Sequence, residues 1–259
     1  GEGNALGNLG LAWADLGETK KAISYYEQQL AIAREIGDRR GEGNALGNLG
    51  LAWADLGETK KAISYYEQQL AIAREIGDRR GEGNALGNLG LAWADLGEAR
   101  KAIEHHEQAL AVSRAIGDKR AEGQDLGNLG NAWYSLGEAR KAIGYYEQQL
   151  EITREIGDRR GEGNALGNLG IAWKDLGEPR KAIGFYEQRL AIAREIGDRL
   201  GESIALWNGA QARDGLGERA RAIEEAKLSL RIKRAIEDPW AVKVEAWLRA
   251  HGVDPDAAG

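Results

Sequence analysis

The fold is decided by residues 38–78, DRRGEGNALGNLGLAWADLGETKKAISYYEQQLAIAREIGD, a stretch that holds two helix-length segments separated by Gly57. Asp38 belongs to the residue types that cap helix N-termini, and glycine is the residue that most often ends a helix. We therefore predict one helix from after Asp38 to about Leu56, and a second from about Glu58 to the residue before the next glycine.

Apolar side chains recur along both segments at the three- and four-residue spacing that places them on one face of a helix. The expected packing face comprises Ala45, Leu46, Leu49, Ala52, Trp53 and Leu56 in the first helix and Ala62, Ile63, Tyr66, Leu70, Ala73 and Ile76 in the second. No segment alternates with the two-residue period of a β-strand. The stretch predicts an α-helical hairpin.

This hairpin is one copy of a tandem repeat with a period of 40 residues. The copies are residues 1–40 and 41–80, which are identical, then 81–120, 121–160 and 161–200 with substitutions, and a degenerate copy at 201–238. Repeats of this length bury apolar surface only against their neighbours, so they form a solenoid without a single central core. We expect a capping helix over 239–251, opened by Asp238-Pro239, and a disordered tail over 252–259.

Composition excludes several classes of protein. The 259 residues include no Cys and no Met and carry a formal net charge of -6. Without Cys there is no disulfide framework, thiolate metal site or Cys nucleophile. No apolar run approaches the roughly 18 residues of a membrane span, and the acidic balance argues against a general nucleic-acid binder. We expect a cytoplasmic protein with neither membrane nor nucleic-acid partners.

The sequence offers no constellation for catalysis. His105 and His106 replace two tyrosines of the repeat, and adjacent helical residues point about 100° apart, which does not suit a shared metal ion. The pattern Gly41-x-Gly43-x3-Gly47 departs by one residue from the dinucleotide-binding spacing and follows a helix instead of a strand. We predict that the chain is not an enzyme and holds no cofactor and no metal.

The hairpin resembles the tetratricopeptide repeat (TPR) signature, with Trp where Tyr is usual. The matching residues are Leu6-x2-Leu9-Gly10-x2-Trp13, then Gly17, then Ala22-x3-Tyr26. The chain departs from the family at Gln29, where Ala is usual, and at Arg34, where the terminal Pro would fall. The 40-residue form is similar to LGN/Pins scaffolds and to the arrays of bacterial signalling (STAND-type) ATPases. The resemblance, strong over 1–200 and weak over 201–240, implies an all-α, right-handed α-solenoid: a TPR superhelix of six hairpins plus a capping helix.

A polar stripe follows each first helix, opposite the packing face. In the second repeat, Arg40, Asn44, Asn48, Leu51 and Asp55 fall within an arc of about 80°. Asn is a poor helix former, but its amide both donates and accepts, so it can pair with both groups of a peptide unit. In the TPR family this face lines the concave groove that holds peptides. We therefore predict a non-catalytic protein-interaction module that binds an extended or helical segment through an Asn ladder.

The expected groove residues are Asn4, Asn8, Arg40, Asn44, Asn48, Asp55, Arg80, Asn84, Asn88, Asp95, Arg120, Gln124, Asn128, Asn131, Tyr134, Ser135, Arg160, Asn164, Asn168, Lys174, Asp175 and Asn208. First helices about 10 Å apart would present one Asn to about every third residue of an extended peptide. Substitutions at Gln124, Asn131, Tyr134, Ser135 and Lys174 fit side-chain specificity, and neutral drift explains them equally well. Those at Glu104, His105, His106, Val112 and Ser113 are expected on the convex side. The repeated tryptophans are expected in the core.

Other interpretations remain open. The asparagines could bond neighbouring helices and set the superhelix. The array could be a structural spacer, the sensor arm of a larger signalling protein, or a module that associates end to end through its uncapped first repeat. Two identical repeats and the lack of Cys and Met also fit a designed or consensus array with no natural ligand.

Overall fold

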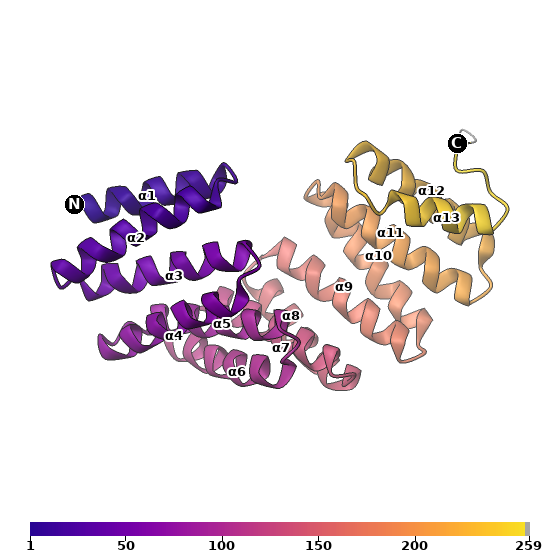
Figure 1. Ribbon diagram of the computed structural model, residues 1–259. Helices are drawn as coiled ribbons and strands as arrows, with labels where there is room; N and C mark the ends of the chain where they lie inside the picture. Colours follow the sequence, from indigo (N-terminus) through magenta and orange to yellow (C-terminus); the bar gives the residue numbers. More distant parts are fainter. Residues whose placement is uncertain (257–259) are drawn as a thin grey trace. The chain divides into compact units, whose positions relative to one another are not determined.

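The computed structural model describes residues 1–256, and every regular element in that range is an α-helix (Figure 1). The helices are α1 (Glu2–Asp15), α2 (Thr19–Glu35), α3 (Arg39–Asp55), α4 (Thr59–Glu75), α5 (Arg79–Asp95), α6 (Ala99–Ile116), α7 (Lys119–Ser135), α8 (Ala139–Glu155), α9 (Arg159–Asp175), α10 (Pro179–Glu195), α11 (Arg199–Gly215), α12 (Arg219–Ala235) and α13 (Ala241–Ala250). The chain divides into two compact units, residues 1–136 with α1 to α7 and residues 137–259 with α8 to α13. Within each unit consecutive helices pack together, which confirms the predicted all-α solenoid class.

Local signals end the helices where the sequence predicts. Asp38 accepts a hydrogen bond from the backbone N–H of Gly41 at 2.9 Å and so caps α3. Gly57 follows α3 with a φ of +77°, a conformation that suits glycine and closes the helix. Leu56 and Ile76 were expected on the packing face, but they are 38% and 37% exposed. The reason is that each residue lies just beyond the end of its helix.

The two helices of a hairpin approach closely because glycine faces an aromatic ring. A Cβ on Gly50 would lie 2.3 Å from the ring of Tyr66, so α3 and α4 could not pack as they do with a larger residue there. Leu46 and Leu49 are completely buried in the same layer. Trp53 is only half-buried: its ring packs against this core, and the Nζ of Lys61 lies 4.1 Å from its centre.

The charged segment between hairpins ties three consecutive helices together. Glu42, which is 7% exposed on α3, accepts a hydrogen bond from Nε of Arg34 on α2 at 2.8 Å and another from Arg39. Arg39 also pairs with Glu75 on α4. Burial would raise the pKa of Glu42, but the hydrogen bonds from the two arginines outweigh it, so the pKa is lowered. The Gly-Asp-Arg-Arg-Gly-Glu segment therefore has a structural role.

The second unit ends in the helix α13, which packs against α12. Val244 and Leu248 are completely buried there. The helix begins at Ala241 instead of Pro239, because Asp238 accepts a hydrogen bond from the N–H of Trp240 at 2.9 Å and holds a turn before it.

The segment expected to be a disordered tail is described as far as residue 256. Val253 packs against the cluster beneath α13, and Asp256 accepts a hydrogen bond from Nη2 of Arg234 at 2.7 Å. Residues 257–259 lie outside the described residues.

The degenerate repeat buries a charge where the other repeats have Trp. Arg213 is 4% exposed and is surrounded by Glu187, Glu218 and Glu225, with its Nε 2.9 Å from an oxygen of Glu225. Three carboxylates compensate this guanidinium, so the position is an ion cluster within the second unit.

Candidate ligand-binding groove

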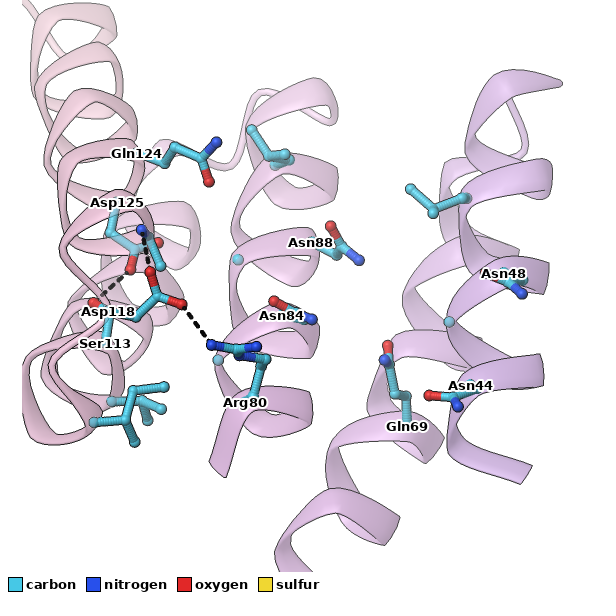
Figure 2. Close-up of a pocket in the computed structure, with 18 of the residues that line it drawn as sticks. Asn44, Asn48, Gln69, Arg80, Asn84, Asn88, Ser113, Asp118, Gln124 and Asp125 are labelled. Carbon is cyan, nitrogen blue, oxygen red and sulfur yellow. Dashed lines mark hydrogen bonds and ion pairs between the residues drawn. The ribbon is translucent and has the colours of Figure 1, made fainter. Parts of the chain in front are cut away.

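A groove of about 650 Å³ runs along the first helices of the first unit. The predicted residues that line it are Asn4, Asn8, Asn44, Asn48, Arg80, Asn84, Asn88, Gln124 and Asn128. Leu11, Leu51 and Leu91 of the same stripes also line it. Figure 2 shows Asn44 and Asn48 on α3, and Asn84 and Asn88 on α5, the first helix of the following hairpin.

The groove amides have no hydrogen-bonding partners inside the first unit. Within the described residues, the side chains of Asn44, Asn48, Asn84 and Asn88 make no hydrogen bond to backbone or to other side chains. Asn48 and Asn88 are half-buried, whereas Asn44 and Asn84 are exposed. Each amide thus offers a donor and an acceptor to the groove.

The floor of the groove comes from the second helices, which the sequence analysis did not anticipate. Gln29 and Gln69 are 6% and 9% exposed and line the groove from α2 and α4. Their carboxamides lie against Gly7 and Gly47, where an added Cβ would come within 2.9 and 2.8 Å of the amide. In the described part of the chain, the Oε1 atom of each Gln is buried and has no hydrogen-bond partner. The sequence did contain one indication of this floor, because Gln29 stands where Ala is usual in TPRs.

The floor changes in the third repeat, where Ala109 stands in place of the Gln. Beside Gly87 the nearest side-chain atom is Oδ1 of Asp125, 4.0 Å from where a Cβ would lie. Asp125 is 8% exposed, and its Oδ2 accepts a hydrogen bond from Oγ of Ser113 at 3.0 Å (Figure 2). Burial raises the pKa of Asp125 to about 6, and the negative charge of Asp118 acts in the same direction.

The arginines at the start of the first helices pair with the capping aspartates of the following repeat. Nη2 of Arg80 lies 3.5 Å from Oδ2 of Asp118, and Nε of Arg40 lies 3.8 Å from Oδ2 of Asp78. Arg80 lines the groove, but Arg40 does not. Both guanidiniums are largely exposed, so these ion pairs are weak and open to exchange.

The other predicted site residues fall outside this groove. In the first unit, those not among its lining residues are Arg40, Asp55, Asp95, Arg120, Asn131, Tyr134 and Ser135. In the second unit, Arg160 and Asn164 border a small cleft together with Arg189, whereas Asn168, Lys174, Asp175 and Asn208 do not border it.

Three residues expected on the convex side lie elsewhere. Val112 and Ser113 are buried and line the groove. His106 is 1% exposed and packs against Gly90, as Tyr66 packs against Gly50. Burial, aided by the neighbouring His105, lowers the pKa of His106 to about 4, so the ring is neutral at physiological pH. The expectation failed because it treated the second helix as one outer surface, although one of its faces reaches the groove.

These features define a helical-hairpin repeat protein with a polar groove on its first helices. The tetratricopeptide repeat family profile matches residues 2–75, 54–115 and 124–195, which together span most of the chain. The chain belongs to the tetratricopeptide repeat family, whose members are generally non-catalytic interaction modules.

Several solved structures share this fold at low sequence identity. The STAND signal-transduction ATPase with a tetratricopeptide repeat sensor from Pyrococcus horikoshii is 20% identical, with a TM-score of 0.83; the match covers 97% of this chain and 39% of that one. BtubC from P. vanneervenii is also 20% identical, with a TM-score of 0.76 and coverage of 85% and 92%. A Rap protein complexed with competence and sporulation factor is 18% identical, with a TM-score of 0.68 and coverage of 96% and 74%.

No curated protein sequence matches the chain. Among the helices that the structure describes, none is both long and apolar enough to cross a membrane. Nor does the described part of the chain bring three or more His, Asp or Glu side chains together in a way that could hold a metal ion.

Proposed function

We propose that this chain is a protein-interaction module whose groove binds an extended peptide segment of a partner protein. The observation that carries the proposal is the row of amides at Asn44, Asn48, Asn84 and Asn88, which border a groove of about 650 Å³ without internal hydrogen bonds. We also propose that the chain meets this partner in the cytoplasm.

The chemistry of the groove suits a peptide backbone. A backbone N–H and C=O that leave water need replacement hydrogen bonds, and each Asn amide provides one acceptor and two donors on one rigid group. The exposed Leu51 and Leu91 lie beside these amides and can contact apolar side chains of the same segment. A Rap protein that shares this fold is complexed with competence and sporulation factor, which supports a ligand-binding role for the groove.

A random peptide display library tests the proposal. The library is panned against the parent chain, against an Asn48→Ala/Asn88→Ala variant, and against a Glu67→Ala/Glu107→Ala control. Both control residues are exposed on second helices and do not line the groove. We expect to recover peptides that bind the parent and the control at least tenfold more tightly than they bind the Asn variant. The far-UV circular dichroism spectra of the three proteins should be identical. Equal affinity for all three proteins would refute the amide mechanism.

A second candidate function is self-association through α1. Leu9 on α1 is 46% exposed, whereas the equivalent Leu49 on α3 is completely buried. A second copy of the chain could cover this apolar face. Light scattering over a concentration series of the parent and of Leu9→Lys should then show a dimer that the substitution abolishes, and a parent that stays monomeric excludes the idea.

A further inference from the structure

We infer that the groove contains a subsite for a primary ammonium group in the space between Gly87, Ala109 and Asp125. The inference deepens the proposed function and rests on it for the source of the ammonium, a lysine side chain or the N-terminus of the bound peptide. The small-molecule test below does not require that any peptide binds.

The space for the ammonium arises from one substitution in the third repeat. In the second repeat, the carboxamide of Gln69 fills the position beside Gly47. Ala109 lacks the terminal CH₂–CONH₂ group of Gln, so the equivalent position beside Gly87 has no side-chain atom closer than Oδ1 of Asp125 at 4.0 Å. The opening is continuous with the groove, because Gly87 and Asp125 are both among its lining residues.

The charge for the ammonium arises from a second substitution at the same place. Asp125 occupies the position that is Ala85 in the preceding repeat. It is more than nine-tenths buried. Its Oδ2 accepts a hydrogen bond from the hydroxyl of Ser113, and its Oδ1 is turned toward the opening. A buried carboxylate is unfavourable unless a cation or several donors compensate it.

No cation in the described part of the chain supplies that compensation. Among the residues that the structure describes, no Lys or Arg side chain is within ion-pair distance of Asp125. Two cations of α5 and α7 have other partners, since Arg80 pairs with Asp118 and Lys119 pairs with Glu122. Asp118 adds a second negative charge at this end of the groove, as Figure 2 shows.

A primary ammonium fits this arrangement better than a guanidinium. The opening corresponds to one missing carboxamide, which matches the end of a lysine side chain, whereas the planar guanidinium is wider and carries donors on three nitrogens. An ammonium has three donors: one would reach Oδ1 of Asp125, and the others would face the groove amides. Its positive charge would also favour the ionised form of Asp125.

The carboxyl carbon of Asp125 reports binding directly in ¹³C NMR at pH 7.5, with aspartate-labelled protein. The probes are n-butylammonium, which mimics a lysine side chain, glycinamide, which mimics a peptide N-terminus, and n-butanol as a neutral control. Asp125→Asn identifies the resonance by its loss. We expect a saturable shift with at least one ammonium probe and none with n-butanol. The tighter of the two ammonium probes indicates the source.

Ala109→Gln is the matched variant, because it refills the opening as in the second repeat and leaves Asp125 in place. We expect it to weaken ammonium binding at least tenfold while the far-UV spectrum stays unchanged. An absent shift in the parent protein, an equal shift with n-butanol, or full binding by Ala109→Gln would each overturn the subsite. Peptide enrichment without an ammonium response would leave the proposed function standing and remove the subsite. An ammonium response without peptide enrichment would leave the subsite standing and remove the proposed function.

Discussion

Replacing Asp125 with Asn should stabilise the protein at neutral pH and have little effect in acid. Burial raises the pKa of this carboxyl from 3.8 to about 6. The folded protein holds the proton of Asp125 more tightly than the unfolded chain does. Asp125 therefore does not lower the free energy of unfolding below its unfolded pKa, and it lowers it by the full amount once the pH exceeds the folded pKa. A pKa difference of about two corresponds to about 3 kcal/mol. Asn keeps the volume and can still bond to Ser113, so it removes only the charge.

Urea unfolding followed by circular dichroism measures this effect. We expect Asp125→Asn to raise the free energy of unfolding by about 2–3 kcal/mol at pH 7.5 and by about 0.5 kcal/mol at pH 4. Because solenoids can unfold in parts, hydrogen exchange in α6 and α7 gives the local free energy at the site. Asp95→Asn, at an exposed position, is the matched control and should change stability by at most about 0.5 kcal/mol. Unchanged stability of Asp125→Asn at pH 7.5 would refute the reasoning.

Four further substitutions test the packing and the buried charges. Burial lowers the pKa of His106 to about 4, so the stability that its neutral ring contributes is complete above the unfolded pKa of 6.5 and is lost as the pH falls toward 4. The parent protein should therefore lose about 2–3 kcal/mol of unfolding free energy at this position between pH 7 and 4.5. His106→Tyr should abolish that loss, as measured by urea unfolding at each pH. Gly50→Ala places a Cβ 2.3 Å from the Tyr66 ring and should destabilise by about 1–3 kcal/mol, whereas Gly43→Ala, 3.6 Å from the nearest side chain, should stabilise by about 0.5–1 kcal/mol in the same assay. Arg213→Ala leaves carboxylates without their cation and should lower the free energy of unfolding by about 3 kcal/mol; a loss below about 1 kcal/mol would show that water already solvates them.

The sequence predicts the hairpins well because their boundaries depend on local chemistry. The Asp38 cap and the Gly57 stop act within one turn of the chain, so α3 and α4 match their expected bounds to within about a residue. The Asn stripe is equally local, since rotation of about 100° per residue places Asn44 and Asn48 on one face whatever the tertiary structure.

The remainder depends on which residues of different helices meet. Gln69 reaches the groove floor only because Gly47 leaves room for its carboxamide, and that pairing joins positions 22 residues apart that no periodicity links. Periodicity likewise places Val112 and Ser113 on their helix without showing that this face turns toward the groove. The ion cluster around Arg213 requires three carboxylates from two helices and the turn between α11 and α12, which a single substitution does not reveal.

The junction between the second and third repeats provides an internal reference for the junction between the third and fourth. At that reference junction Gln69 and Ala85 place a neutral amide and a methyl group in the buried interior. Ala109 and Asp125 remove the amide from one helix and place a carboxylate on the next, which keeps a polar atom in the space but exchanges a neutral group for a charged one. Packing alone does not favour that exchange, because an uncompensated buried carboxylate is destabilising at neutral pH. A cation bound from outside would reverse the sign of the effect, so stability and ammonium binding at Asp125 should respond to substitution in opposite directions.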